Sequence, residues 1–83
     1  MEAKLFEVDL RNRVVSGFKE KPIKGTQGRW HQEAIPCLAE SQGEAEEFAF
    51  RKVKARKILG IPRNTKRRGL KRKIEVLNTR RLA

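Results

Sequence analysis

The stretch KLFEVDL, at residues 4–10, decides the fold class because its apolar and acidic residues alternate. Phe6, Val8 and Leu10 fall on one side of an extended chain, and the two acidic residues between them fall on the other. This period of two is typical of a strand that is buried on one face and exposed on the other. The stretch therefore predicts the first strand of a sheet with one apolar face.

Two further strands are expected before the centre of the chain. A polar break at residues 11–13 precedes a second apolar group, so we expect a hairpin whose second strand ends near Lys19. Residues 20–28 contain a proline and two glycines without an apolar period, which predicts a loop. Residues 29–39 predict a third strand, and Pro36 within it removes one backbone donor, so this strand is expected to be an edge strand or to be bulged.

A capping box predicts where a helix begins. Ser41 and Glu44 stand three residues apart, so the serine oxygen and the glutamate carboxylate can satisfy amides of a first turn. The apolar residues that follow fall on one stripe at about 100° per residue, out to Leu59. Two basic residues intrude on that stripe and leave two alternatives. Either one long helix continues, and the stems of the two basic side chains lie along apolar surface with their charged ends in water, or the helix breaks near Phe50 and a second begins.

The C-terminal third predicts a further, basic element. Residues 60–62, Gly-Ile-Pro, are typical of a helix stop. After them, apolar residues recur at positions 70, 74 and 77, so we expect a basic helix from about Asn64 to Asn78. A strand at Lys73–Leu77 is the alternative, because apolar and charged residues also alternate there and Gly69 weakens a helix by up to about 1 kcal/mol.

These elements predict an α+β fold: a small three-stranded antiparallel sheet, followed by one long or two short helices and a basic C-terminal helix. A chain of 83 residues is too short for a second independent core. We therefore expect one small α+β body over residues 1–60 and a basic helix or tail over residues 61–83.

The positive charge is concentrated in one stretch. Residues 1–50 hold seven basic and nine acidic residues, a net of −2, whereas residues 51–83 hold fourteen basic residues and the single acid Glu75, a net of +13. The two parts give the total of +11. Charges this dense repel one another unless a partner neutralises them, which favours a polyanionic partner such as nucleic acid.

Within residues 53–73, the segment ILGIPRNTKRRGLK at residues 58–71 resembles the helix-turn-helix of the Fis family and related bacterial activators. The family has a Leu-Gly-Ile turn, an Arg-Asn-Thr start of the recognition helix, paired arginines and a Leu-Lys. The resemblance implies a helix that enters the major groove of DNA with its N-terminal side chains at the base edges. Here those side chains are Arg63, Asn64, Thr65, Arg67 and Arg68.

A second resemblance covers residues 4–57. Three strands, then Ala39-Glu40-Ser41 and an alanine-bearing helix, are similar to the arm-binding domain of tyrosine integrases. In that family the sheet docks on DNA. The resemblance implies possible sheet-side contacts from Arg11, Arg13, Lys19, Lys21, Lys24 and Arg29.

We therefore expect a nucleic-acid-binding protein, first of all a small DNA-binding regulator or accessory factor of bacterial or phage type that can form a homodimer. An RNA- or ribosome-associated protein is the first alternative, and a module that docks on an acidic protein partner is the second. Binding is predicted for the basic and polar residues of the C-terminal third, with strong salt dependence. They are Arg63, Asn64, Thr65, Lys66, Arg67, Arg68, Lys71, Arg72, Lys73, Arg80 and Arg81.

Several other chemistries are not expected. One cysteine, Cys37, and one histidine, His31, cannot complete a four-ligand zinc site, and neither has a catalytic partner at an interpretable spacing. No apolar run approaches a membrane span and no signal peptide is recognisable, so we expect a cytoplasmic protein that is not an enzyme and has no cofactor. Trp30 is expected either in the core or as a platform on which a base stacks.

Overall fold

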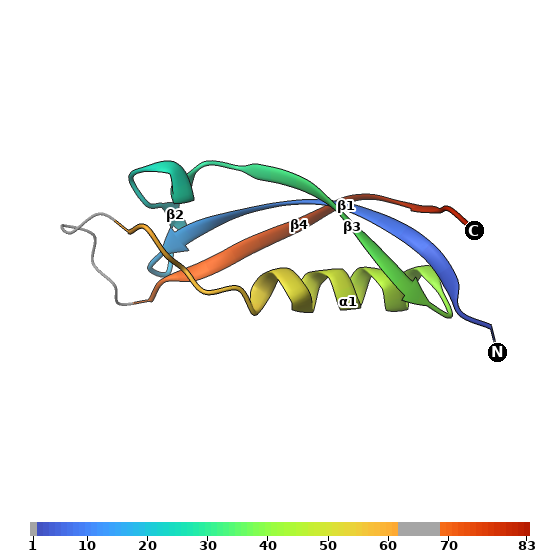
Figure 1. Ribbon diagram of the computed structural model, residues 1–83. Coiled ribbons are helices and arrows are strands. Elements are labelled where there is room, and N and C mark those ends of the chain that lie inside the picture. The colour runs from blue at the N-terminus through green and yellow to red at the C-terminus, as the bar shows by residue number, and fades with distance from the viewer. Residues whose placement is uncertain (1, 62–68) are drawn as a thin grey trace.

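The computed structural model describes residues 2–61 and 69–83 as an antiparallel sheet with one helix (Figure 1). The α+β class and the antiparallel sheet are therefore confirmed. In chain order the elements are β1 (Lys4–Ser16), β2 (Lys21–Pro22), the short 3-10 turn η1 (Thr26–Gly28), β3 (His31–Ala39), α1 (Gln42–Lys54) and β4 (Lys71–Arg81).

Strand β1 is the centre of the sheet. Its partner on one side is β3, with Lys4 opposite Ala39 and Asn12 opposite His31. On the other side it pairs with β4, in a register interrupted by a bulge after Asp9. The two-residue β2 pairs with the last residues of β1. Since β3 pairs only with β1, the expectation of an edge strand there is confirmed.

The core lies between the sheet and α1. Phe6, Val8 and Leu10 of β1 point towards the helix, as their alternation predicts, and all three are buried. Helix α1 contributes residues four apart, Ala45, Ala49 and Val53, and β3 contributes Ile35, Cys37 and Ala39. The two alanines leave room for the helix to lie close to the sheet, along one of its faces (Figure 1).

Helix α1 begins as the sequence predicts and ends earlier. Ser41 is the N-cap, and its hydroxyl accepts a hydrogen bond from the Glu44 amide at 3.2 Å. The helix runs through Phe50 without a break and ends at Lys54, so a helix extending to Leu59 is wrong, as is a second helix starting near Phe50. The guanidinium of Arg56 turns to the sheet and forms two hydrogen bonds with Glu33, at 2.5 and 2.7 Å.

The predicted hairpin lies further along the chain than expected. No break occurs at residues 11–13, because β1 continues to Ser16 and the turn follows at residues 17–20. Polar residues are accommodated there because Arg11 and Arg13 face away from the helix, while the buried Asn12 between them hydrogen bonds to its neighbours. A polar residue can therefore continue a strand when its partners are on adjacent strands.

The predicted C-terminal helix is wrong for residues 71–78, which belong to strand β4. Arg72, Ile74 and Val76 of β4 lie opposite Val14, Asn12 and Leu10 of β1. This pairing provides hydrogen-bond partners for the backbone groups along the second edge of β1. A helix over residues 71–78 would leave those groups of β1 without partners on that edge, so the strand is favoured over the local helical period. Within the described residues, no helix is long and apolar enough to span a membrane.

Candidate nucleic-acid interface

The face of the sheet opposite α1, here called the open face, is largely polar and has no covering α-helix among the described residues, although Val15 at its end is fully buried. It consists of the alternate residues of β1 that do not point at α1, together with the residues paired to them. These are Leu5, Glu7, Asp9, Arg11, Arg13 and Val15 of β1, Gln32, Ala34, Pro36 and Leu38 of β3, and Lys71, Lys73, Glu75, Asn78 and Arg80 of β4.

Trp30, the single tryptophan of the chain, lies against two arginines of the open face. The guanidinium carbon of Arg11 is 4.1 Å from the ring centroid and that of Arg13 is 4.2 Å from it. Trp30 is half-buried and lies outside the apolar core. Cation–π stacking of this kind fixes the plane of a guanidinium. The indole therefore holds two cationic side chains in place on this face.

The two arginines differ in how their charge is neutralised. Arg11 forms an ion pair with Glu75, at 2.6 Å. For Arg13 the described residues provide no carboxylate within ion-pair distance, and its buried Nε lacks a hydrogen-bond partner there. A buried N–H donor without an acceptor is unfavourable, and a positive charge without a nearby carboxylate would be stabilised by an added anion.

Two lysines beside the β1–β2 turn share one carboxylate. Lys71 and Lys73 lie 2.6 and 3.3 Å from different oxygens of Glu20. Hydrogen bonds and charge from the two lysines hold the pKa of Glu20 below its ordinary value. Since one negative charge faces two positive ones, the cluster keeps an excess of positive charge.

The charge of the open face is uneven along the strands. We call the end that carries the turn at residues 17–20 the hairpin end. There Lys71 and Lys73 share Glu20, and Arg13 has no carboxylate within ion-pair distance among residues 2–61 and 69–83. Towards the other end of β1, Arg80 is paired with Glu7. The hairpin end is thus the cationic part of the open face.

The structure separates the residues that the sequence predicted together. Lys71, Lys73 and Arg80 are on the open face, whereas Arg72 points to the α1 side and Arg81 lies opposite Phe6, also on that side. The remaining predicted residues lie outside the described part of the chain and are Arg63, Asn64, Thr65, Lys66, Arg67 and Arg68.

The sheet-side group is also divided by the structure. Arg11 and Arg13 are on the open face beside Trp30. The other four residues of this group lie in the segment between β1 and β3, and all four are exposed: Lys19, Lys21, Lys24 and Arg29. The stacking of Trp30 on Arg13 was missed by the sequence analysis. A period of two that continues from residue 10 to residue 16 is the signal that would have placed both arginines on one face.

No family model, curated protein or solved structure matches the chain. Among residues 2–61 and 69–83, no group of three or more histidine, cysteine, aspartate or glutamate side chains is placed to hold a metal ion. The geometry of the open face is therefore the basis for a functional proposal.

Proposed function

We propose that the chain binds nucleic acid, duplex DNA in preference to RNA, through the hairpin end of the open face. The observation that carries this proposal is the stacking of Trp30 on Arg11 and Arg13, next to Lys71 and Lys73. In this role the protein would act in the cytoplasm as a small regulator or accessory factor of bacterial or phage type.

The stacked arginines suit phosphate recognition. A guanidinium that lies flat on an aromatic ring keeps its N–H donors at its edge, in the plane where a phosphate accepts them. Because Trp30 already holds Arg13, less side-chain freedom is lost when the arginine meets an anion. Within the described part of the chain no carboxylate is paired with Arg13, so no ion pair there has to break before a phosphate binds.

The strands supply a shape that duplex DNA can accept. The major groove is wide enough for a two-stranded β-ribbon, and several DNA-binding proteins insert strands in this way. Arg13 of β1 lies directly opposite Lys73 of β4, and Val15 lies opposite Lys71. Two neighbouring strands therefore present cations side by side. These cations can contact the phosphates of the DNA backbone when the strands enter the groove.

The basic segment outside the described residues is part of the proposal on sequence grounds. The resemblance of residues 58–71 to a Fis-type helix-turn-helix implies contacts at the base edges from five side chains, namely Arg63, Asn64, Thr65, Arg67 and Arg68. Gly69, the first described residue after residues 62–68, lies near Gly17 of the hairpin turn, at the cationic end of the open face.

The test compares two triple variants that remove the same charges. Arg13, Lys71 and Lys73 are changed to glutamine in one protein, and Arg51, Lys52 and Lys54 of α1 in the other. Binding to a labelled 20-base-pair duplex is followed by fluorescence anisotropy over a range of salt concentrations. If three phosphate contacts are lost, the log–log salt slope falls by about 2.7 in the open-face variant, and its affinity at low salt falls by more than about tenfold.

The α1 variant should keep the wild-type salt slope. Equal losses in the two variants would contradict an interface on the open face, because net charge alone would then govern binding.

Competition by RNA hairpins and single-stranded RNA at fixed salt tests the choice of nucleic acid, and a tenfold preference for RNA would overturn the preference for DNA. A partner retained in a pull-down after nuclease treatment would instead favour an acidic protein.

A further inference from the structure

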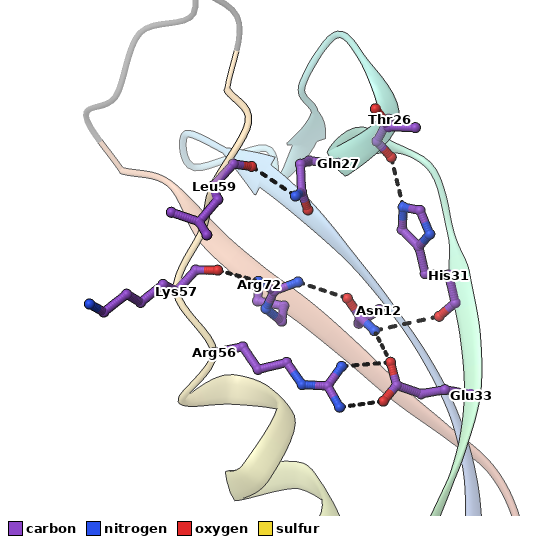
Figure 2. Close-up of a pocket in the computed structure, with 9 residues that line it drawn as sticks. All are labelled: Asn12, Thr26, Gln27, His31, Glu33, Arg56, Lys57, Leu59 and Arg72. Carbon is purple, nitrogen blue, oxygen red and sulfur yellow. Dashed lines mark hydrogen bonds and ion pairs between the residues drawn. The ribbon is translucent and has the colours of Figure 1, made fainter.

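A second charged site lies on the α1 side of the sheet, past the last turn of the helix. It is a cavity of about 370 Å³, shown in Figure 2, between β1, β3 and β4 and the segment that follows α1. Asn12, Glu33, Arg56 and Arg72 point towards one another in this cavity. It is on the opposite side of the sheet from Arg13, so it is separate from the proposed DNA interface.

Arg72 lines this cavity, and none of the described carboxylates forms an ion pair with it. Its Nη1 donates to Oδ1 of Asn12 at 2.9 Å, and its Nη2 donates to the backbone oxygen of Lys57 at 3.4 Å. Both acceptors are neutral, and the buried Nε lacks a hydrogen-bond partner among the described residues. Desolvation, with the nearby charge of Arg56, lowers the pKa of Arg72. The environment thus disfavours the cation that it contains.

Glu33, the one acid among the described residues that line the cavity, is already paired with Arg56. Both oxygens of Glu33 accept hydrogen bonds from Arg56, and one of them also accepts a 3.5 Å bond from the Asn12 amide. Two arginines, Arg56 and Arg72, line the cavity with this single carboxylate, and Lys57 faces Arg72 with its backbone oxygen while its side chain points away (Figure 2). A second negative charge would therefore be stabilised there, most of all beside Arg72.

We propose that this cavity binds a phosphate group, either free phosphate or the phosphate of a mononucleotide. A planar guanidinium with free donors matches the geometry of phosphate oxygens. The amide of Gln27 and the ring of His31 are further polar groups on the wall, and Leu59 offers an apolar surface. The volume of about 370 Å³ falls in the range of small-molecule sites, which is roughly 300–1,000 Å³.

The experiment is a titration of the full chain with inorganic phosphate, AMP and adenosine at constant ionic strength. Binding is followed by NMR through the side-chain Nε–H resonances of the arginines. Phosphate and AMP should shift the Arg72 resonance in a saturable way, whereas adenosine, which lacks the phosphate, should not. Tighter binding of AMP would assign a nucleotide, and equal binding would assign the phosphate alone.

Two substitutions with opposite expected effects test the site. Arg72→Gln should weaken phosphate binding by at least about tenfold, because it removes the unneutralised cation. Glu33→Gln should tighten binding by about three- to tenfold, because it removes the competing carboxylate. Arg51→Gln, an exposed arginine on α1, is the matched control and should bind phosphate as the wild type does.

The Glu33 variant keeps the proposal testable if Arg72→Gln fails to fold, which circular dichroism and thermal unfolding would reveal. An absence of phosphate binding, a response to adenosine equal to that of AMP, or unchanged affinity in Glu33→Gln would each overturn the proposal. None of these outcomes affects the DNA interface, since the cations of the open face are unchanged in all three variants.

Discussion

The two ends of the sheet are built differently, although one central strand runs through both. At the end covered by α1, the residues of β1 that face the helix are Phe6, Val8 and Leu10, all buried in apolar surroundings. At the hairpin end the same side of the sheet carries Asn12 and, opposite Val14, Arg72. One end is a conventional core, whereas the other combines the buried Val14 with a network of hydrogen bonds and ion pairs.

Element length explains this difference. Strand β1 and helix α1 have thirteen residues each. A strand of that length extends for about 43 Å at 3.3 Å per residue, whereas a helix extends for about 20 Å at 1.5 Å per residue. The helix therefore covers about half of the strand, in agreement with Figure 1. Beyond Lys54 no α-helix covers the sheet among the described residues, so polar groups that the chain and solvent can satisfy lie beside the buried Val14.

The largest effect of a substitution on the free energy of unfolding is expected at the end of the sheet that α1 covers. Leu10→Ala removes a fully buried side chain from the contact between the sheet and α1. We expect it to lower the free energy of unfolding by about 2–5 kcal/mol, enough to unfold much of so small a domain. Urea denaturation followed by circular dichroism measures the change. The control is Leu38→Ala on the open face, where the side chain is 67% exposed and the cost should be below about 0.5 kcal/mol.

A smaller effect is expected at the hairpin end. Asn12→Leu keeps the size of a buried side chain but removes the acceptor for Arg72 and the donor to the backbone oxygen of His31. Leaving these groups without partners should cost about 1–3 kcal/mol. The same urea experiment tests this. A variant more stable than the wild type would show that the hairpin end could have been an apolar core.

The ion pair between Glu33 and Arg56 makes stability depend on pH. The hydrogen bonds from Arg56, with smaller contributions from Asn12 and Arg72, keep the pKa of Glu33 below its ordinary value of 4.5 in the folded protein. A lowered folded-state pKa gives stability that is present above pH 4.5 and is lost as the pH falls through the folded-state pKa.

Unfolding free energies measured between pH 2 and pH 7 test this sign. Glu33→Gln should flatten the acid side of the curve, because the titrating group is gone. Arg56→Gln should flatten it as well, because Glu33 then titrates closer to its unfolded value. If both variants lose stability on acidification as steeply as the wild type does, then other carboxylates are responsible.

The smallest expected effect is on binding at the open face. Glu20→Gln removes the carboxylate that Lys71 and Lys73 share. Exposed ion pairs are worth about 0.2–1 kcal/mol each, so affinity for duplex DNA should rise by about two- to fourfold at low salt. Anisotropy titrations measure this, and the gain should shrink as salt is added. Weaker binding by this variant would mean that Glu20 positions the lysines for DNA rather than competing with it.

Local patterns predicted the elements that depend on local chemistry. The alternation from Phe6 to Leu10 identified the core strand, and Ser41 marked the start of the helix. The C-terminal strand was mistaken for a helix because its apolar residues satisfy both periods, and only pairing with β1, more than fifty residues away, decides between them. Contacts of this kind leave little trace in a single sequence.

The candidate site was predictable only in its charge. The sequence placed an excess of cations in the last third and named Lys71 and Lys73, but it could not show that β4 lies beside Arg13 of β1. The sequence also grouped Arg72 with Lys71 and Lys73, because a helix was expected there. A strand instead sends adjacent residues to opposite faces, so Arg72 lies on the other side of the sheet. The cavity beside Arg72 depends on where α1 ends, which the stripe out to Leu59 overestimated.

The most direct test of the account uses Trp30, since the chain has no other tryptophan and its indole lies on the open face. The indole N–H resonance is followed by NMR while duplex DNA is added, together with the backbone amides of Ala45 and Ala49 in α1. An interface on the open face predicts a saturable shift of the indole resonance that reverses in high salt, with little change in the amide resonances of the helix. If DNA binds while the indole resonance stays in place and the α1 amides move, the interface is not on the open face.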